Sequence, residues 1–265
     1  MRVINLASGS KGNATLVEHG KTKILIDAGL PLKVLEERLA KAGCSLSEIG
    51  AVLVSHTHID HVKSVAKIST KFGIPVYAPR ECFFEEKLSL VGMEQRREIG
   101  LEDFFLDEIK VQTFEVLHDA PKTIGFVFHC DGNKVGLVTD VGYLDELILS
   151  KLQGSNLIMI ESNYDAQMLE NGPYPYILKR RIASRMGHLS NFDCSRAILE
   201  LSKRGTQYFM LMHLSETNNT PEIAYNTVMN VLYDEFGEDN GVRVVLAEQN
   251  DVSPNFLFKH REEGE

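Results

Sequence analysis

Short apolar segments bounded by turn residues recur along the chain and predict β-strands. They cover residues 2–7, 14–18, 23–27, 51–55, 74–77, 109–117, 123–130, 134–139, 156–160, 208–212 and 242–247. Segments with apolar residues at helical spacing lie between many of these strands. They cover residues 31–42, 60–72, 81–90, 143–152, 193–203 and 221–236. The pattern therefore predicts strands that alternate with helices, with a charged connection over residues 94–103.

One of the predicted turns carries a strong local signal. Asp131, Gly132 and Asn133 separate the strands predicted at 123–130 and 134–139. An Asp-Gly pair between two apolar segments favours a tight β-turn, because both residues tolerate positive φ. The sequence therefore predicts a β-hairpin here.

A dense cluster of potential metal ligands follows the strand predicted at 51–55. His56, His58, Asp60 and His61 fall within six consecutive positions, on the loop before the next helix. Two histidines two positions apart can face the same way in an extended backbone and bind one cation, while the following turn directs Asp60 and His61 to a second. Imidazole and carboxylate together suit zinc, iron or manganese rather than calcium. A surface loop that happens to be rich in histidine is the alternative, but the whole chain has only nine histidines.

Further polar residues stand at the ends of other apolar strands. They are His118, Asp140 and His213. Ligand sites in α/β proteins lie at the carboxyl ends of strands, so we expect these residues to join the first cluster. One metal would be held by His56, His58 and His118, a second by Asp60, His61 and His213, and Asp140 would bridge both. Two such cations, about 3.5–4 Å apart, would polarise an ester and lower the pKa of water to about 7.

Composition limits the remaining possibilities. The net charge of −9 argues against a surface made for non-specific nucleic-acid binding, although a local basic groove remains open. The N-terminus does not resemble a signal peptide and no apolar stretch approaches the length of a membrane span, so we expect a cytoplasmic protein with no membrane partner. The four cysteines form no CxxC pair and are expected to be free thiols. We expect residues 1–265 to form a single domain, with a charged tail over about 256–265 that contains His260.

The same residues carry a family resemblance that covers nearly the whole chain. In order, Asp27, His56-x-His58-x-Asp60-His61, His118, Asp140 and His213 resemble the motifs of the metallo-β-lactamase fold superfamily. The resemblance implies an α/β (α+β) fold, a four-layer αββα sandwich of two mixed, mostly antiparallel sheets with helices outside. Asp140 at the bridging position, rather than Cys, resembles the dinuclear hydrolases. Asp27 would then support the metal loop by hydrogen bonding.

A finer resemblance is to the YycJ (also called WalJ) subfamily. It rests on Ser8-Gly9-Ser10-x-Gly12-Asn13, Glu161-Ser162-Asn163, Tyr174-Pro175, Lys179-Arg180-Arg181-Ile182, Gly187-His188-Leu189-Ser190-Asn191 and His213-Leu214-Ser215-x-x-Asn218-Asn219. That subfamily is described as a cytoplasmic 5′ to 3′ DNA exonuclease associated with mismatch repair, which implies DNA ends as the partner. Relatives often have His where this chain has Tyr164, so the role of that position stays open.

Gly187-His188-x-Ser190 also resembles a motif of ribonucleases Z and J, in which the His helps to protonate the leaving oxygen or contacts the phosphate. We therefore expect His188 to be catalytic, together with Asp60 and Asp140. Substrate contacts are expected from Ser190, Asn191, Lys179, Arg180 and Arg181, the last three in the one basic stretch of an acidic chain. The alternatives are a solvated helix face for the basic stretch and a structural residue at the start of a helix for His188.

Several functions share such a site. A small-molecule phosphodiesterase, a thioesterase and a ribonuclease Z-like RNA nuclease are rivals. Only 72 positions separate Asp140 from His213, which leaves no room for the large inserted domain of ribonuclease J relatives. A non-hydrolytic metal-binding or redox protein is the rival from another class. The choice among zinc, manganese and iron, the DNA or RNA preference, the polarity of digestion and the oligomeric state, a homodimer included, stay open.

Overall fold

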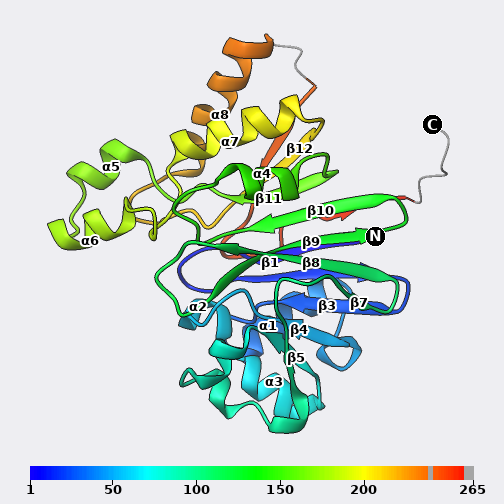
Figure 1. The fold of residues 1–265 in the computed structure, drawn as a ribbon. Coiled ribbons are helices and arrows are strands. Elements are labelled where there is room, and N and C mark those ends of the chain that lie inside the picture. Colours follow the sequence, from blue (N-terminus) through cyan, green and yellow to red (C-terminus); the bar gives the residue numbers. More distant parts are fainter. Residues whose placement is uncertain (238–240, 260–265) are drawn as a thin grey trace.

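The computed structural model describes residues 1–237 and 241–259, and it arranges them as two β-sheets packed face to face between two layers of helices (Figure 1). The first sheet contains, in spatial order, β14 (Phe256–Leu257), β1 (Arg2–Ala7), β2 (Ala14–His19), β3 (Thr22–Ile26), β4 (Ala51–Leu53), β5 (Val76–Ala78) and β6 (Arg96–Glu98). The second contains β13 (Arg243–Leu246), β12 (Tyr208–Met212), β11 (Leu157–Glu161), β10 (Asn133–Val138), β9 (Thr123–Cys130), β8 (Ile109–Val116) and β7 (Phe104–Leu106).

The helices divide between the two outer layers. The layer on the first sheet contains α1 (Leu32–Lys41), α2 (Ile59–Val62) and α3 (Val65–Phe72). The layer on the second contains α4 (Glu146–Leu152), α7 (Asn191–Lys203) and α8 (Pro221–Phe236), while α5 (Ala166–Asn171) and α6 (Tyr176–Ile182) stand out to the side of it (Figure 1). None of the helices in the described residues has the length and hydropathy needed to cross a bilayer.

Successive side chains along each central strand point to opposite faces of the sheet, and this separates the layers. In β3, Ile24 and Ile26 pack between the two sheets, whereas Leu25 packs under the helices of the first layer. In β12, Met210 faces the space between the sheets and Leu211 faces the second helical layer. Because successive side chains of a strand point to opposite faces, each central strand contributes to two apolar cores. Three buried clusters result, and together they confirm the four-layer αββα prediction.

The expectation that both sheets are mixed is confirmed, but the expectation of mostly antiparallel pairing is wrong. Within the described residues, each sheet has three antiparallel and three parallel strand pairs. Consecutive strands joined by turns or loops make most of the antiparallel pairs, as at the predicted Asp131-Gly132 turn, where φ is 52° and 69°. The pair of β1 with β14 is the exception, because these strands come from opposite ends of the chain. Helices that cross between consecutive strands make the parallel half, because a parallel pair needs a long crossover.

Four local predictions differ from the structure. The helix predicted over 60–72 is broken after α2, because Ser64 donates from its backbone N and its hydroxyl to the carbonyls of Ala28 and Leu30, at 2.9 and 2.6 Å. The helix predicted over 81–90 consists of two 3₁₀ turns, and the connection over 94–103 contains the edge strand β6.

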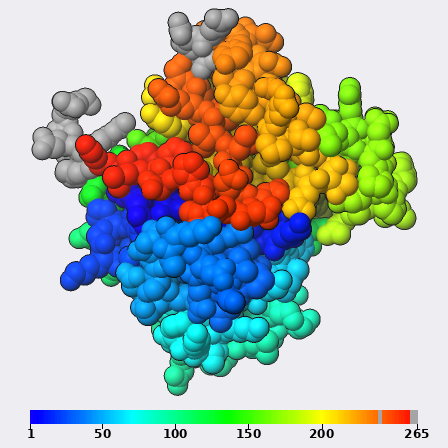
Figure 2. Space-filling view, turned by 180° about the vertical axis from the view of Figure 1, so that it is seen from behind, coloured from blue at the N-terminus to red at the C-terminus, as the bar shows by residue number. Residues whose placement is uncertain are grey.

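The predicted tail differs as well, because β14 pairs with β1, with Val3 opposite Phe256. The C-terminal segment drawn in red lies against the blue N-terminal strand in Figure 2. The rest of the predicted tail from residue 260, including His260, lies outside the described residues. That residues 1–265 form a single domain stays a prediction.

Candidate metal centre

The potential metal ligands meet at the edge of the sandwich where strands of both sheets end. His56 follows β4, His118 follows β8, Asp140 follows β10 and His213 follows β12. Asp27, Asp140 and His213 adopt positive φ values of 58°, 57° and 55°. Residues other than glycine rarely do so, and surrounding contacts must hold the backbone in this conformation. The chain therefore turns sharply at these three residues, just after β3, β10 and β12.

One group of ligands consists of His56, His58 and His118, whose ligating nitrogens all lie within 4.8 Å of one another. His118 Nε2 lies 3.3 Å from His58 Nδ1. His118 Nδ1 is 3.0 Å from the carbonyl oxygen of Gly187 and must donate to it, which leaves the Nε2 lone pair facing the other two rings. The three rings therefore form a pocket of nitrogen ligands.

The other group consists of Asp60, His61 and His213, which satisfy the same distance criterion of 4.8 Å. His61 Nδ1 lies 2.8 Å from Asp27 Oδ2, and His213 Nδ1 lies 2.7 Å from Glu161 Oε1. Both rings thus donate to a carboxylate through Nδ1, which turns their Nε2 atoms toward Asp60. Asp60 Oδ2 lies 3.6 Å from each of these Nε2 atoms.

Asp140 lies between the two groups and is 1 % exposed. Its Oδ1 is 3.9 Å from His118 Nε2 in the first group and 3.5 Å from His213 Nδ1 in the second. Its Oδ2 is 3.2 Å from His61 Nε2. The structure therefore brings all seven predicted ligands together, with Asp140 between the two groups.

Three buried atoms in this centre test whether a cation fits. His56 Nε2, His213 Nε2 and Asp140 Oδ2 make no hydrogen bond within the described residues. A buried polar atom without a partner costs roughly 1–3 kcal/mol, so this arrangement is unfavourable without a further group. Imidazole nitrogen and carboxylate oxygen are the donors that zinc, manganese and iron accept. The residues present therefore fit divalent metal ions.

The electrostatics of the centre also favour a cation. Burial alone would lower the pKa of His61, but the carboxylates of Asp140, Asp27 and Asp60 outweigh burial and raise that pKa well above its usual value. At His213, burial is again overcome by neighbouring carboxylates, and the pKa is raised. The centre thus attracts positive charge, and protons and metal ions compete for the same nitrogen atoms.

The loop that carries the ligands is held by residues near the end of β3. Ser55 donates from its backbone N to Asp27 Oδ1 at 2.8 Å and from its hydroxyl to Asp27 Oδ2 at 2.7 Å. The backbone N of Asn13 donates to the carbonyl oxygen of Asp60 at 2.7 Å. Gly29 lies so close that a Cβ there would be 1.5 Å from the same oxygen. The loop is therefore fixed from two sides before any ligand binds.

Glu161 lies in this site although its role was not predicted from the sequence. Its Oε1 lies 2.8 Å from His188 Nδ1, and its Oε2 accepts from the backbone N of Val141 and of Leu189 at 2.9 and 3.1 Å. Burial would raise the pKa of Glu161, but His188 and His213 lower it to about 2. Glu161 therefore orients His188 as an ionised carboxylate. Its position at the end of an apolar strand was the signal that could have revealed it.

A cavity of about 260 Å³ opens over the centre and is lined by four of the ligands together with His188 and several residues around α6. Arg181 lines this cavity and is ion-paired with Asp119. Asp119 Oδ1 makes no hydrogen bond within the described residues, and it lies 3.5 Å from His58 Nε2 and 3.4 Å from His118 Nε2. Asp119, which follows a predicted ligand, thus links Arg181 to the centre.

The other predicted substrate contacts lie elsewhere. Lys179 Nζ donates to the carbonyl oxygen of Glu170 at 2.6 Å, and neither Lys179 nor Arg180 lines the cavity. Ser190 caps α7 by accepting from the backbone N of Asp193 at 3.0 Å.

Two neighbouring side chains are also enclosed by the protein. Asn191 is buried and bonded to Ser162 and Asn219, at 2.7 and 2.9 Å. Tyr164 is buried as well, burial raises its pKa to about 12, and it does not line the cavity. These side chains therefore hold the protein together around the site and do not face a substrate in the cavity.

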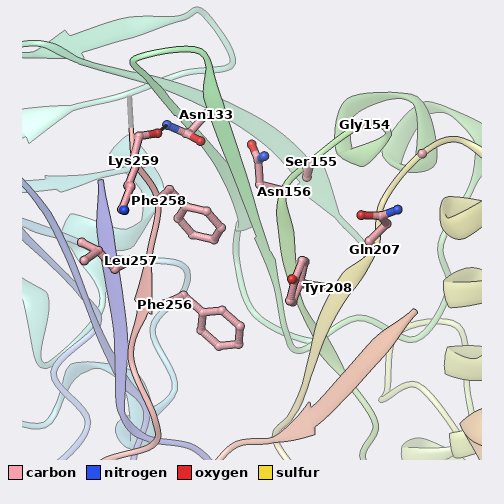
Figure 3. A pocket seen from close by; sticks show the side chains of 11 residues that line it. Asn133, Gly154, Ser155, Asn156, Gln207, Tyr208, Phe256, Leu257, Phe258 and Lys259 are labelled. Carbon is pink, nitrogen blue, oxygen red and sulfur yellow. Dashed lines mark hydrogen bonds between the residues drawn. The ribbon is translucent and has the colours of Figure 1, made fainter. Parts of the chain in front are cut away.

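A larger cavity, of about 450 Å³, lies at the opposite ends of β11 and β12 (Figure 3). Tyr208, Phe256, Phe258 and Asn156 project into it. Its 11 lining residues, all of them described, include no His, Cys, Asp or Glu. This cavity therefore lacks the kinds of metal ligand that line the smaller one at the carboxyl ends of the strands.

Comparison with known proteins agrees with this geometry. A family model described as "Beta-lactamase superfamily domain" matches residues 22–214. The chain is 34% identical over 258 residues to "Exodeoxyribonuclease YycJ" of Bacillus anthracis, covering 96% of each protein. It is 34% identical over 233 residues to "Exodeoxyribonuclease WalJ" of Streptococcus pneumoniae serotype 2, covering 86% of each. Among solved structures, the metallo-β-lactamase fold protein YhfI from Bacillus subtilis has a TM-score of 0.73 at 17% identity, covering 95% of this chain and 98% of that one.

Proposed function

Because this chain belongs to the β-lactamase superfamily and is a metal-dependent hydrolase, we propose that it is an exonuclease that hydrolyses phosphodiester bonds at DNA ends. The observation that carries the proposal is the position of His188, held by Glu161 at the wall of a cavity that opens onto two groups of metal ligands. The names of two relatives that are 34% identical supply the class of substrate. The 5′ to 3′ polarity, the link to mismatch repair and the cytoplasmic location follow from the subfamily resemblance and stay predictions.

Two divalent cations are part of the proposal. His56, His58 and His118 would hold one, Asp60, His61 and His213 would hold the other, and Asp140 would contact both. When bound, such cations lower the pKa of water and neutralise charge on the phosphoryl oxygens. Zinc, manganese and iron all suit this set of ligands.

The residues of the chain supply the remaining requirements of the reaction. A departing oxygen needs a proton, and His188 is the group placed to give it. Burial would lower the pKa of His188, but the Glu161 carboxylate raises it, so the ring holds a proton more firmly than a free histidine does. Since Nδ1 faces Glu161, Nε2 is the atom available to a substrate in the cavity. Asp60 and Asp140 serve catalysis through the cations that they would hold.

Arg181 is the cation that we assign to the substrate phosphate. It lines the cavity, and its ion pair with Asp119 restrains the side chain beside the centre. A guanidinium group presents several donors in one plane, which matches the oxygen atoms of a phosphate.

A panel of substrates tests the proposal against its rivals. Protein loaded with manganese, zinc or iron is incubated with duplex DNA, structured RNA, a small phosphodiester and a thioester at equal concentrations. We expect mononucleotides to be released from DNA at the highest kcat/KM. Release from RNA alone would favour a ribonuclease Z-like activity, and turnover of only the small ester or thioester would overturn the nuclease proposal.

A further inference from the structure

We infer that residues 172–186, which we call the α6 arm, form a docking surface for a single strand of DNA that leads into the cavity. This inference rests on the proposed function and extends it. The scissile phosphate would lie at the metal centre, and the α6 arm would contact nucleotides beyond it.

The first observation is the exposure of the α6 arm. The structure describes α6 in full, and none of its residues is buried. Tyr176 and Ile177 are 72% and 82% exposed. Helices of globular proteins normally bury an apolar face, and an exposed apolar patch marks an interaction site. Figure 1 shows α5 and α6 standing out from the layer of helices, and Figure 2 shows the same segment as a yellow-green lobe.

The second observation is the charge of the α6 arm. Residues 172–186 include Lys179, Arg180, Arg181 and Arg185 and no Asp or Glu, in a chain with a net charge of −9. Such a local concentration of positive charge on an acidic protein attracts a polyanion, because the binding of phosphates releases their counterions. Charge complementarity therefore favours nucleic acid over a protein partner or a second copy of this acidic chain.

The third observation is the pairing of arginines with exposed aromatic rings. The guanidinium carbon of Arg185 lies 4.3 Å from the ring centre of Tyr143, and that of Arg180 lies 5.8 Å from the ring centre of Tyr176. Flat aromatic and guanidinium surfaces stack on nucleobases, which are accessible only when a strand is unpaired. The surface therefore suits a single strand better than an intact duplex.

The α6 arm is continuous with the catalytic cavity. Leu178 and Arg181 from one side of α6 line that cavity. At the other end of the arm, the backbone N of His188 donates to the carbonyl oxygen of Ile182 at 2.9 Å. The segment that carries Asp140 packs closely against the same end of the arm. A Cβ on Gly142 would lie only 2.4 Å from the carbonyl oxygen of Ser184. A strand on the arm would thus pass directly to the metal centre.

A binding titration tests the inference without relying on cleavage. The metal-loaded protein is titrated against a fluorescent single-stranded oligonucleotide with phosphorothioate linkages at several salt concentrations. We expect Tyr176→Ala and Arg185→Ala each to weaken binding about tenfold. We expect Arg185→Ala also to reduce the slope of log affinity against log salt by about 0.7. Lys67→Ala, which removes one exposed charge from α3 in the other helical layer, is the matched control and should change neither quantity.

Turnover of a small chromogenic phosphodiester separates the two proposals. We expect Tyr176→Ala and Arg185→Ala to hydrolyse bis(p-nitrophenyl) phosphate at the parent rate, because neither side chain lines the cavity. Arm variants that bind the oligonucleotide with the parent affinity and salt slope would overturn the inference, and a change in oligomeric state on Tyr176→Ala would point to a second copy of the chain instead. A parent protein that binds DNA but hydrolyses neither DNA nor the small ester would contradict the proposed function and leave the docking surface supported.

Discussion

Replacement of Glu161 by glutamine tests the hydrogen-bond network under the catalytic cavity. The carboxylate accepts from two histidine rings through Oε1 and from two backbone N–H groups through Oε2, at 2.7–3.1 Å. An amide has one accepting oxygen, so in either orientation of the new side chain two donors would face an NH₂ group. Each buried donor without a partner costs roughly 1–3 kcal/mol, and the loss of two predicts a destabilisation of about 2–6 kcal/mol. This is a large part of the stability of a typical domain, about 5–15 kcal/mol.

The assay is urea denaturation of the metal-loaded protein, read together with kcat on DNA. Because His188 loses the carboxylate that raises its pKa, we expect kcat to fall by about 10²–10⁴. Glu170→Gln, an exposed substitution of the same chemistry on α5, is the matched control and should leave both readings unchanged. If Glu161→Gln unfolds at the parent urea concentration and keeps the parent kcat, the carboxylate does not hold the two histidines and the reasoning fails.

Three further outcomes are expected. Removal of metal by a chelator should abolish hydrolysis and lower the midpoint of thermal unfolding measured by calorimetry, because the buried ligand atoms of the centre lose their partner. An unchanged midpoint would count against metal binding at this centre. Neighbouring carboxylates outweigh burial and raise the pKa of His61 and His213, so Zn²⁺ must displace protons from these rings at neutral pH and should bind more tightly as pH rises. Calorimetric heats of Zn²⁺ binding that are equal in two buffers of different ionisation enthalpy would contradict this proton release. Gly29→Ala should lower the free energy of unfolding by about 1–3 kcal/mol or more and weaken metal binding, because its Cβ would lie 1.5 Å from the backbone oxygen of Asp60. Gly50→Ala is the control and should be tolerated, because its Cβ would have its nearest contact at 3.7 Å.

Patterns local in the sequence predicted most of the elements and the cluster of ligands. The helix predicted over 221–236 matches α8 in full, because Thr220 accepts from Ile223 N and Pro221 follows as a favourable first residue. The order of histidines after β4 was informative because a strand end fixes where the following loop points. The spacing of His118, Asp140 and His213 at other strand ends then predicted where the sheets would bring them together.

The features that were not predicted from the sequence depend on contacts between distant parts of the chain. The break between α2 and α3 depends on bonds from Ser64 to the segment after β3, more than thirty positions earlier in the chain. β14 forms because Phe256 pairs with Val3 of β1, at the other end of the chain. The role of Glu161 depends on two histidines that reach it from separate loops. Periodicity within a short window carries no information about such partners.

The exonuclease proposal is tested most directly by digestion of end-labelled duplex DNA by the metal-loaded protein, with His58→Ala and His188→Ala assayed in parallel. We expect mononucleotide release from one end. It should be abolished in His58→Ala, with loss of bound metal, and slowed by about 10²–10⁴ in His188→Ala, with metal content unchanged. No cleavage of DNA with manganese, zinc or iron bound would contradict the proposal, as would a His188→Ala protein that digests DNA at the parent rate.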